Sequence, residues 1–139
     1  MEKFQAKIDV VNRDGAEPAL IVAEEILTDQ EETYRVTLSC RGEKIVGESE
    51  RGFFAALQEV RITLEGREAL LHCFGASEDV YPSPMQESMG PAVLAYRTRL
   101  GEQALSKDIV NIFDSDGTVK PSSVQEQKEF HQRWLQSLA

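Results

Sequence analysis

The chain has few of the side chains that build most catalytic and metal centres. Its 139 residues include only two cysteines and two histidines. They lack the CxxC and HxxxH spacings that zinc sites use, so no metal site is predicted. His72 and Cys73 are adjacent, and a strand would point them to opposite faces, which argues against a paired nucleophile and base. Cys40 and Cys73 lie in apolar, strand-like surroundings, which indicate small buried thiols rather than a disulfide scaffold.

Motifs for nucleotide binding and hydrolysis are missing as well. GxSxG, GxGxxG and GxxxxGK[ST] do not occur, which removes the usual signals of a serine hydrolase or a nucleotide-binding enzyme. The stretch 114–117 resembles the start of a calcium loop, but the later acidic ligands are missing, so a turn is predicted. Glu78 and Asp79 could act as acid and base, although loop solvation or capping explains them more simply. We therefore predict that the protein is not an enzyme and holds no cofactor or metal.

Long apolar runs are also missing. No segment approaches the roughly 20 apolar residues of a membrane-spanning helix. The first residues lack the order of charged and then apolar side chains that a signal peptide shows. Hydrophobic residues make up 41% of the chain, enough to fill one core. We therefore expect a cytoplasmic protein that forms a single domain over residues 1–139 and makes no contact with a membrane.

Positive charge is scarce. The chain has 15 Lys and Arg residues against 24 Asp and Glu residues, a net charge of −9. This balance argues against a nucleic-acid partner, because phosphate recognition needs clustered basic side chains. The densest acidic run surrounds a predicted hairpin loop and consists of Glu24, Glu25, Asp29, Glu31 and Glu32. It is either a solvated loop or a patch that steers a basic partner onto the protein.

Alternating apolar and polar residues fill the first part of the chain. This period is typical of half-buried strands, and it predicts four strands, at 4–10, 20–27, 34–40 and 45–48. Asn12-Arg13-Asp14-Gly15 and Arg41-Gly42-Glu43-Lys44 have the composition of turns between them. Successive strands at this spacing indicate an antiparallel meander.

The period then changes to that of a helix. Phe53, Leu57, Val60 and Leu64 form a stripe on one helical face, which predicts a helix that covers one face of the sheet. Ser49 or Glu50 is expected to begin it. Gly66 is expected to end it in the left-handed conformation.

A short strand at 70–74 precedes a stretch that holds three of the five prolines. The segment 83–91 predicts a compact helix, with Ser83 as N-cap and Gln86 completing a capping box. Met85 and Met89 lie four residues apart and are expected to face inward together.

Two further strands, at 93–100 and 109–113, and a helix at 124–138 close the chain. Ser123 and Glu126 form a second capping box. We expect Trp134, the only tryptophan, to dock on the sheet of its own domain, with a partner's groove as the alternative. The pattern as a whole predicts an α+β fold with an antiparallel or mixed sheet of about six or seven strands. Two main α-helices and a short helix are expected to pack on this sheet.

Several short segments of the C-terminal half resemble a group of small uncharacterised bacterial proteins. The segments are 79–85 (DVYPSPM), 89–90, 95–96, 100–101, 108–114 (DIVNIFD), 127–130 and 134–135. In size, acidity and lack of catalytic motifs the chain is similar to immunity proteins, which bind and neutralise a toxin. The resemblance covers about half of the chain and carries over no functional residue.

These observations predict a non-enzymatic binding protein, with a basic toxin or effector domain as its partner. The expected contact residues are Glu24, Glu25, Asp29, Glu31, Glu32, Glu78, Asp79 and Tyr81. One alternative is a chaperone or adaptor for a secreted effector, which would expose an apolar patch near Phe130, Trp134 and Met89. A small enzyme that uses Glu78, Asp79 or His72 is the other alternative.

Overall fold

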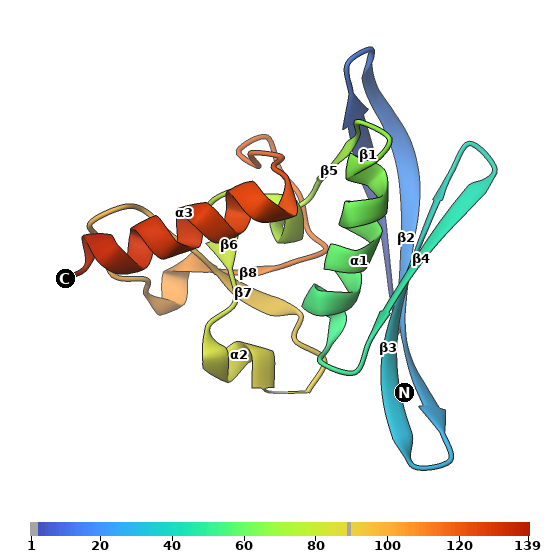
Figure 1. Ribbon diagram of the computed structural model, residues 1–139, viewed down its shortest axis with the longest axis horizontal. Coiled ribbons are helices and arrows are strands. Elements are labelled where there is room, and N and C mark those ends of the chain that lie inside the picture. The colour runs from blue at the N-terminus through green and yellow to red at the C-terminus, as the bar shows by residue number, and fades with distance from the viewer. Residues whose placement is uncertain (1–2, 89) are drawn as a thin grey trace.

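The computed structural model describes residues 3–88 and 90–139 (Figure 1). It confirms the predicted α+β class, with two long α-helices and a short one. The strands are divided between two antiparallel sheets, whereas the sequence suggested one. Within the described residues there are eight strands, five in the first sheet and three in the second.

The N-terminal strands form the larger sheet, in the order β4-β3-β2-β1-β5. The predicted meander is confirmed, and its register pairs buried residues: Leu38 lies opposite both Ile21 and Ile45. The strands are β1 (Lys3–Asn12), β2 (Gly15–Thr28), β3 (Glu31–Cys40), β4 (Glu43–Ser49) and β5 (Leu70–His72).

The strand β2 is longer than the sequence suggested, because it begins at Gly15 and includes a proline. Pro18 pairs with Asp9 of β1, but β3 pairs with β2 only from Leu20 onward. At Pro18 the sheet therefore has a free edge, where a missing N–H removes no ladder hydrogen bond.

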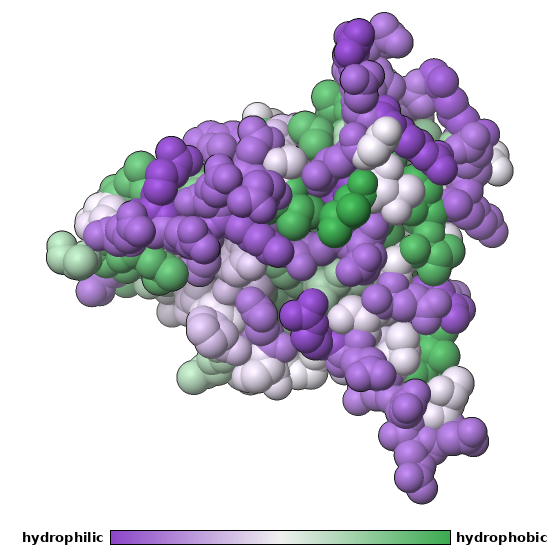
Figure 2. Space-filling model, viewed as in Figure 1, coloured by the Kyte–Doolittle hydropathy of each residue, from purple (hydrophilic) through white to green (hydrophobic). Residues whose placement is uncertain are grey.

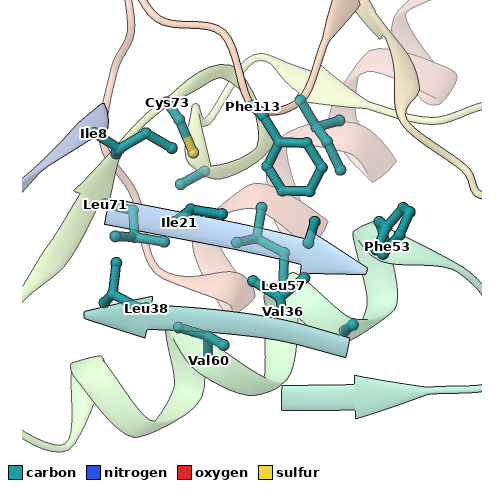
Figure 3. Packing of buried hydrophobic residues seen from close by; sticks show 14 of the residues in the cluster. Ile8, Ile21, Val36, Leu38, Phe53, Leu57, Val60, Leu71, Cys73 and Phe113 are labelled. Atoms are coloured by element: carbon teal, nitrogen blue, oxygen red, sulfur yellow. The ribbon is translucent and has the colours of Figure 1, made fainter. Parts of the chain in front are cut away.

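The helix α1 (Phe53–Glu65) covers one face of this sheet. Figure 3 shows Leu57 and Val60 of α1 against Val36 and Leu38 of the sheet. The helix approaches β4 very closely at Gly47, where an added β-carbon would collide with the carbonyl oxygen of Ala56. The predicted stripe is thus core, and a glycine allows the close packing.

Both ends of α1 differ from the prediction. The N-cap is Gly52, with φ of 117°, because Phe53 N donates to Pro91 O at 2.6 Å and a β-carbon at position 52 would lie 2.7 Å from the Ala92 β-carbon. At the C-terminus, Gly66 is right-handed with φ of −63°. A further turn follows the helix before the chain reverses, so Glu68 takes the left-handed conformation, with φ of 58°. The predicted N-caps Ser49 and Glu50 were wrong, whereas Gly66 is the C-cap as predicted but without the left-handed conformation.

The smaller sheet has the order β6-β7-β8, and its strands are shorter than predicted. The elements of this part are η1 (Phe74–Ala76), β6 (Val80–Tyr81), α2 (Pro84–Ser88), β7 (Leu94–Arg97), η2 (Ser106–Asp108), β8 (Ile109–Asn111) and α3 (Val124–Ser137). Val80 and Ala95 are fully buried and join the core that the larger sheet begins.

The two predicted capping boxes are confirmed. Ser83 Oγ accepts from Gln86 N at 3.1 Å, and Ser123 Oγ accepts from Glu126 N at 3.0 Å. The inward orientation of Met85 was wrong, because its side chain is 70% exposed and none of the described α2 residues is buried. Met89, its expected companion, lies outside the described residues.

A buried polar network holds α3 to α1. Arg61 is 2% exposed, and its guanidinium donates to Gly75 O and Ser122 O, both at 3.1 Å, and to Gln127 Oε1 at 2.6 Å. Burial lowers the pKa of Arg61 to about 10, so the group stays charged at neutral pH. Two carbonyl dipoles and an amide oxygen stabilise this charge directly, and the negative charge of Glu65 also favours it.

Gln127 completes the network from α3. Its Nε2 donates to Gly75 O at 3.1 Å, Ser77 O at 2.9 Å and Val80 O at 2.8 Å. Gly75 lies in η1, Ser77 follows it, and Val80 is the first residue of β6. The amide of Gln127 thus satisfies buried carbonyls of the segment that leads into the smaller sheet. One fully buried side chain thus connects α3, η1 and the start of the smaller sheet.

Candidate functional site

The hairpin of β2 and β3 ends in an acidic tip that projects from the body of the protein (Figure 1). Asp29, Glu31 and Glu32 are exposed there, and Asp29 occupies the turn with φ of 45°. No Lys or Arg occurs between residues 24 and 34. We define Asp29, Glu31 and Glu32 as the acidic tip.

The other two acids of this run lie further down the hairpin. Glu24 and Glu25 are consecutive in a strand and therefore point to opposite faces. Glu24 pairs in register with Arg35 and Lys3, whereas Glu25 lies opposite Tyr34. Burial and the charge of Glu25 raise the pKa of Tyr34. The five predicted contact residues thus do not form one patch.

Glu78, Asp79 and Tyr81 lie elsewhere, beside β6 and away from the acidic tip (Figure 1). Asp79 is 6% exposed, and it accepts from Arg97 Nε at 2.9 Å and from Ser77 Oγ at 2.6 Å. Its carboxylate is therefore bound within the protein. Glu78 is half-buried and faces a polar groove along α3, lined also by Glu126, Glu129, Gln132, Arg133 and Gln136.

The residues suggested for a small enzyme do not share partners. His72 Nδ1 lies 2.8 Å from Ser115 Oγ, and the same hydroxyl donates to His72 O at 2.8 Å. The serine proton is thus directed at a carbonyl oxygen, so the imidazole does not activate this hydroxyl as a base would. Asp79, in turn, is engaged with Arg97.

The exposed face of the smaller sheet carries a row of large apolar side chains. Tyr81, Tyr96 and Ile109 lie opposite one another across β6, β7 and β8. Next to this row is a groove of about 450 Å³, which we call the aromatic groove. It is lined by Tyr81, Ser83, Pro84, Tyr96, Thr98, Gln103, Ala104, His131, Trp134, Leu135 and Leu138.

Stacked rings form one wall of the aromatic groove. His131 lies on Tyr81 with ring centroids 4.3 Å apart and planes 18° apart, and Trp134 follows at 5.8 Å and 27°. The Nδ1 atom of His131 is buried without a hydrogen-bond partner among the described residues. Burial lowers the pKa of His131 and raises that of Tyr81. At neutral pH this wall is therefore uncharged.

Trp134 docks on its own protein, as predicted, but on a turn instead of a sheet. Its Nε1 donates to Glu102 O at 2.8 Å, and Ser137 Oγ accepts from Gly101 N at 2.8 Å. The sequence reasoning missed Tyr96, His131 and the leucines of this groove. The spacing of His131, Trp134, Leu135 and Leu138 on one helical face is the signal that could have identified them.

The acidic tip and the region of the aromatic groove also differ in surface chemistry. Figure 2 shows hydrophilic residues at the ends of the long hairpins and paler, near-neutral residues over α2 and the part around it. Leu135 and Leu138, which line the aromatic groove, are 51% and 39% exposed. Such a concentration of apolar side chains is typical of a binding surface.

The cysteines are free thiols in the structure. Cys73 is fully buried, and burial raises its pKa to about 11, which leaves it protonated and unreactive at neutral pH. Cys40 is half-buried, with its sulfur 3.7 Å from Glu17 Oε2.

No group of three or more His, Cys, Asp or Glu side chains in residues 3–88 and 90–139 could hold a metal ion. In the same part of the chain, every helix is too short or too polar to span a bilayer.

Comparison with known proteins finds no matching protein-family model and no curated protein with significant sequence similarity. The acidic tip and the aromatic groove are therefore the features on which a proposed function rests.

Proposed function

We propose that this protein is a non-enzymatic binding protein of the bacterial cytoplasm, an immunity protein that neutralises a basic toxin or effector domain. The acidic tip is the observation that carries this proposal. It combines three exposed carboxylates, Asp29, Glu31 and Glu32, at the end of a projecting hairpin without a nearby basic residue in its sequence. A chain with a net charge of −9 adds a long-range attraction for a basic partner.

Exposed charges of this kind act on the approach of a partner more than on the strength of the final complex. A single exposed ion pair contributes only about 0–1 kcal/mol. Complementary charge can nevertheless raise the association rate by about 10-fold or more. We therefore propose that the acidic tip steers the partner, and that apolar contacts elsewhere hold it.

The direct test is co-expression with the product of the adjacent gene, followed by purification and an assay of that product. Stoichiometric binding with loss of the partner's toxic activity is the expected result. A partner that binds but stays active would contradict neutralisation and favour the alternative below. A complete lack of binding would contradict the choice of partner.

Charge reversal then tests the surface. The triple variant D29K/E31K/E32K should lower the association rate about 10-fold at low salt and flatten its salt dependence. The matched control D14K/E59K/D114K changes the net charge equally at three exposed acids elsewhere. Equal effects of the two variants would exclude the acidic tip as a specific contact.

The aromatic groove favours a second candidate function, a chaperone or adaptor that holds an apolar segment of a secreted effector. Of the patch expected near Phe130, Trp134 and Met89, Trp134 lines the groove and supports this alternative. Phe130 is half-buried and is not among the lining residues. In this case L135K should abolish binding, and reversal of the acidic tip should have little effect. The immunity proposal expects the association rate to respond to the acidic tip.

A further inference from the structure

The two halves of α3 are attached to the protein in different ways. Val124 and Gln127, both near its N-terminus, are the buried residues of the helix. Gln127 is fixed by the polar network with Arg61. The C-terminal half is held by the stack of His131 and by the bonds of Trp134 and Ser137 to the turn at 101–102. Within the described residues this half contributes no buried side chain, and the His131 stack is its contact with β6 beside those two bonds to the turn.

His131 is placed so that its two protonation states differ strongly in this contact. In the neutral state it stacks between Tyr81 and Trp134, with Nδ1 enclosed and unpartnered within the described residues. Protonation makes both ring nitrogens N–H donors. The new Nδ1–H would then be a charged, buried donor without an acceptor among the described residues, a state that the docked helix disfavours.

The surrounding charges do not compensate for this cost. The titratable groups that stack on or line the same groove are the phenols of Tyr81 and Tyr96. The charged side chains near this part of the protein are Glu87 of α2, Arg51 before α1, Lys128 of α3, and Glu102 in the turn at 101–104. Burial alone accounts for the lowered pKa of His131. Among the described residues, the carboxylates of Glu87 and Glu102 therefore do not offset the cost of burying an imidazolium.

We propose that His131 is a pH-sensitive latch: the neutral ring holds the C-terminal half of α3 against β6 and the turn at 101–104, and protonation releases it. His131, Trp134, Leu135 and Leu138 form one side of the aromatic groove. Release therefore dismantles the groove, which is complete at neutral pH and lost in mild acid. An apolar ligand of the groove would be bound and released with the same pH dependence.

The sign of the pH dependence of docking follows from the linkage between proton binding and the position of the helix. A free histidine titrates near pH 6.5, and burial lowers the pKa of His131 in the docked helix. The released helix thus binds the proton more readily. Docking is complete above about pH 7 and weakens as the pH falls below about 6.5.

The single tryptophan reports on this contact directly. Emission of Trp134 should shift to longer wavelength as the pH falls from about 7.5 to about 5, because the indole leaves the stack. Amides in the C-terminal half of α3 should lose protection from hydrogen exchange by about tenfold, once corrected for intrinsic rates, which corresponds to about 1.4 kcal/mol. In H131F, which keeps an aromatic ring but cannot be protonated, both signals should stay constant.

Controls separate the latch from other titrations. The variant H72Q removes the other histidine and should behave like the wild type, while H131Q, a second uncharged substitution, should be as insensitive to pH as H131F. A transition that persists in H131F and H131Q would overturn the proposal. Wild-type emission that does not change would also overturn it. Quenching of Trp134 without a change in exchange would show that the imidazolium forms in the docked helix, and this too would overturn it.

Discussion

The larger and the smaller sheet use apolar and polar residues in opposite ways. The larger sheet buries aliphatic and aromatic side chains under α1 and places charge at the ends of its hairpins. The region of the smaller sheet is joined to α1 through a buried polar network of Arg61 and Gln127, and it exposes an aromatic groove. A core of well-packed side chains forms with little directional requirement. A buried polar network forms only in one geometry.

This contrast relates stability to binding. The region of the smaller sheet keeps some of its large apolar side chains out of the core. Tyr81, Tyr96 and Trp134 line the groove at its surface. Aromatic side chains in pockets supply most of the energy in protein interfaces. The charged tip of the larger sheet can supply approach and selectivity. We therefore expect mutations in the core and the polar network to change the free energy of unfolding. Mutations in the aromatic groove should change the dissociation of a partner, and mutations in the acidic tip its association rate.

The largest loss of stability is expected at the Arg61 network, where the larger-sheet region meets the region of the smaller sheet. R61M removes the donor to Gly75 O, Ser122 O and Gln127 Oε1. Gly75 O keeps its bond from Gln127 Nε2, but Ser122 O and Gln127 Oε1 lose the donor that satisfies them. The free energy of unfolding should fall by about 3 kcal/mol or more. Urea unfolding followed by circular dichroism measures this loss. R67M is the control, since Arg67 makes an exposed ion pair with Glu43, and its effect should stay below about 1 kcal/mol. Equal losses in both would show that the network does not join the regions.

A smaller but clear effect is expected within the larger sheet. G47A places a methyl group against the carbonyl of Ala56, so α1 must move away from β4. Overpacking of this kind costs about 1–3 kcal/mol. Thermal unfolding measures the cost, with G117A as control because no atom lies within 4 Å of its added β-carbon. Unfolding temperatures that fall equally for both variants would contradict the close approach of α1.

The sequence predicted the larger sheet better than the smaller one, and the reason is local. Alternation over 4–10 and 34–40 is carried by consecutive residues, and so is the stripe from Phe53 to Leu64. The two capping boxes were also readable, because each requires residues only three apart. Gly66 was misjudged because the turn that reverses the chain lies two residues later, at Glu68.

The aromatic groove and the polar network could not be read in the same way. Arg61 and Gln127 are 66 residues apart, and neither carries a local signal of burial. Tyr81, Tyr96 and Ile109 come together only through the register of three short strands. The predicted inward orientation of Met85 was wrong for a related reason. The helix α2 lies on the surface, and the sequence could not show which elements would pack against it. Non-local contacts determine this region.

A modest effect is expected at the N-terminus of α3. S123A removes the hydroxyl that accepts from Glu126 N at 3.0 Å, which should cost about 1 kcal/mol. The loss should appear in hydrogen exchange of the first turn of α3, because Gln127 holds the following turn in place. S123D keeps an acceptor and should preserve protection. Equal exchange in S123A and the wild type would show that the Gln127 network alone fixes this end.

The smallest effect on folding is expected at the acidic tip. Asp29 and Glu31 are exposed, and Glu32 contacts only the hydroxyl of Tyr34, at 2.9 Å, among the bonds of the described residues. D29K/E31K/E32K should therefore change the free energy of unfolding by about 0.5 kcal/mol or less. The same variant should slow association with a basic partner, because it reverses the charge that attracts that partner. Urea unfolding and stopped-flow association on one preparation measure both quantities. A large loss of stability would mean that the tip contributes to the fold, and the contrast between a stable core and a steering surface would fail.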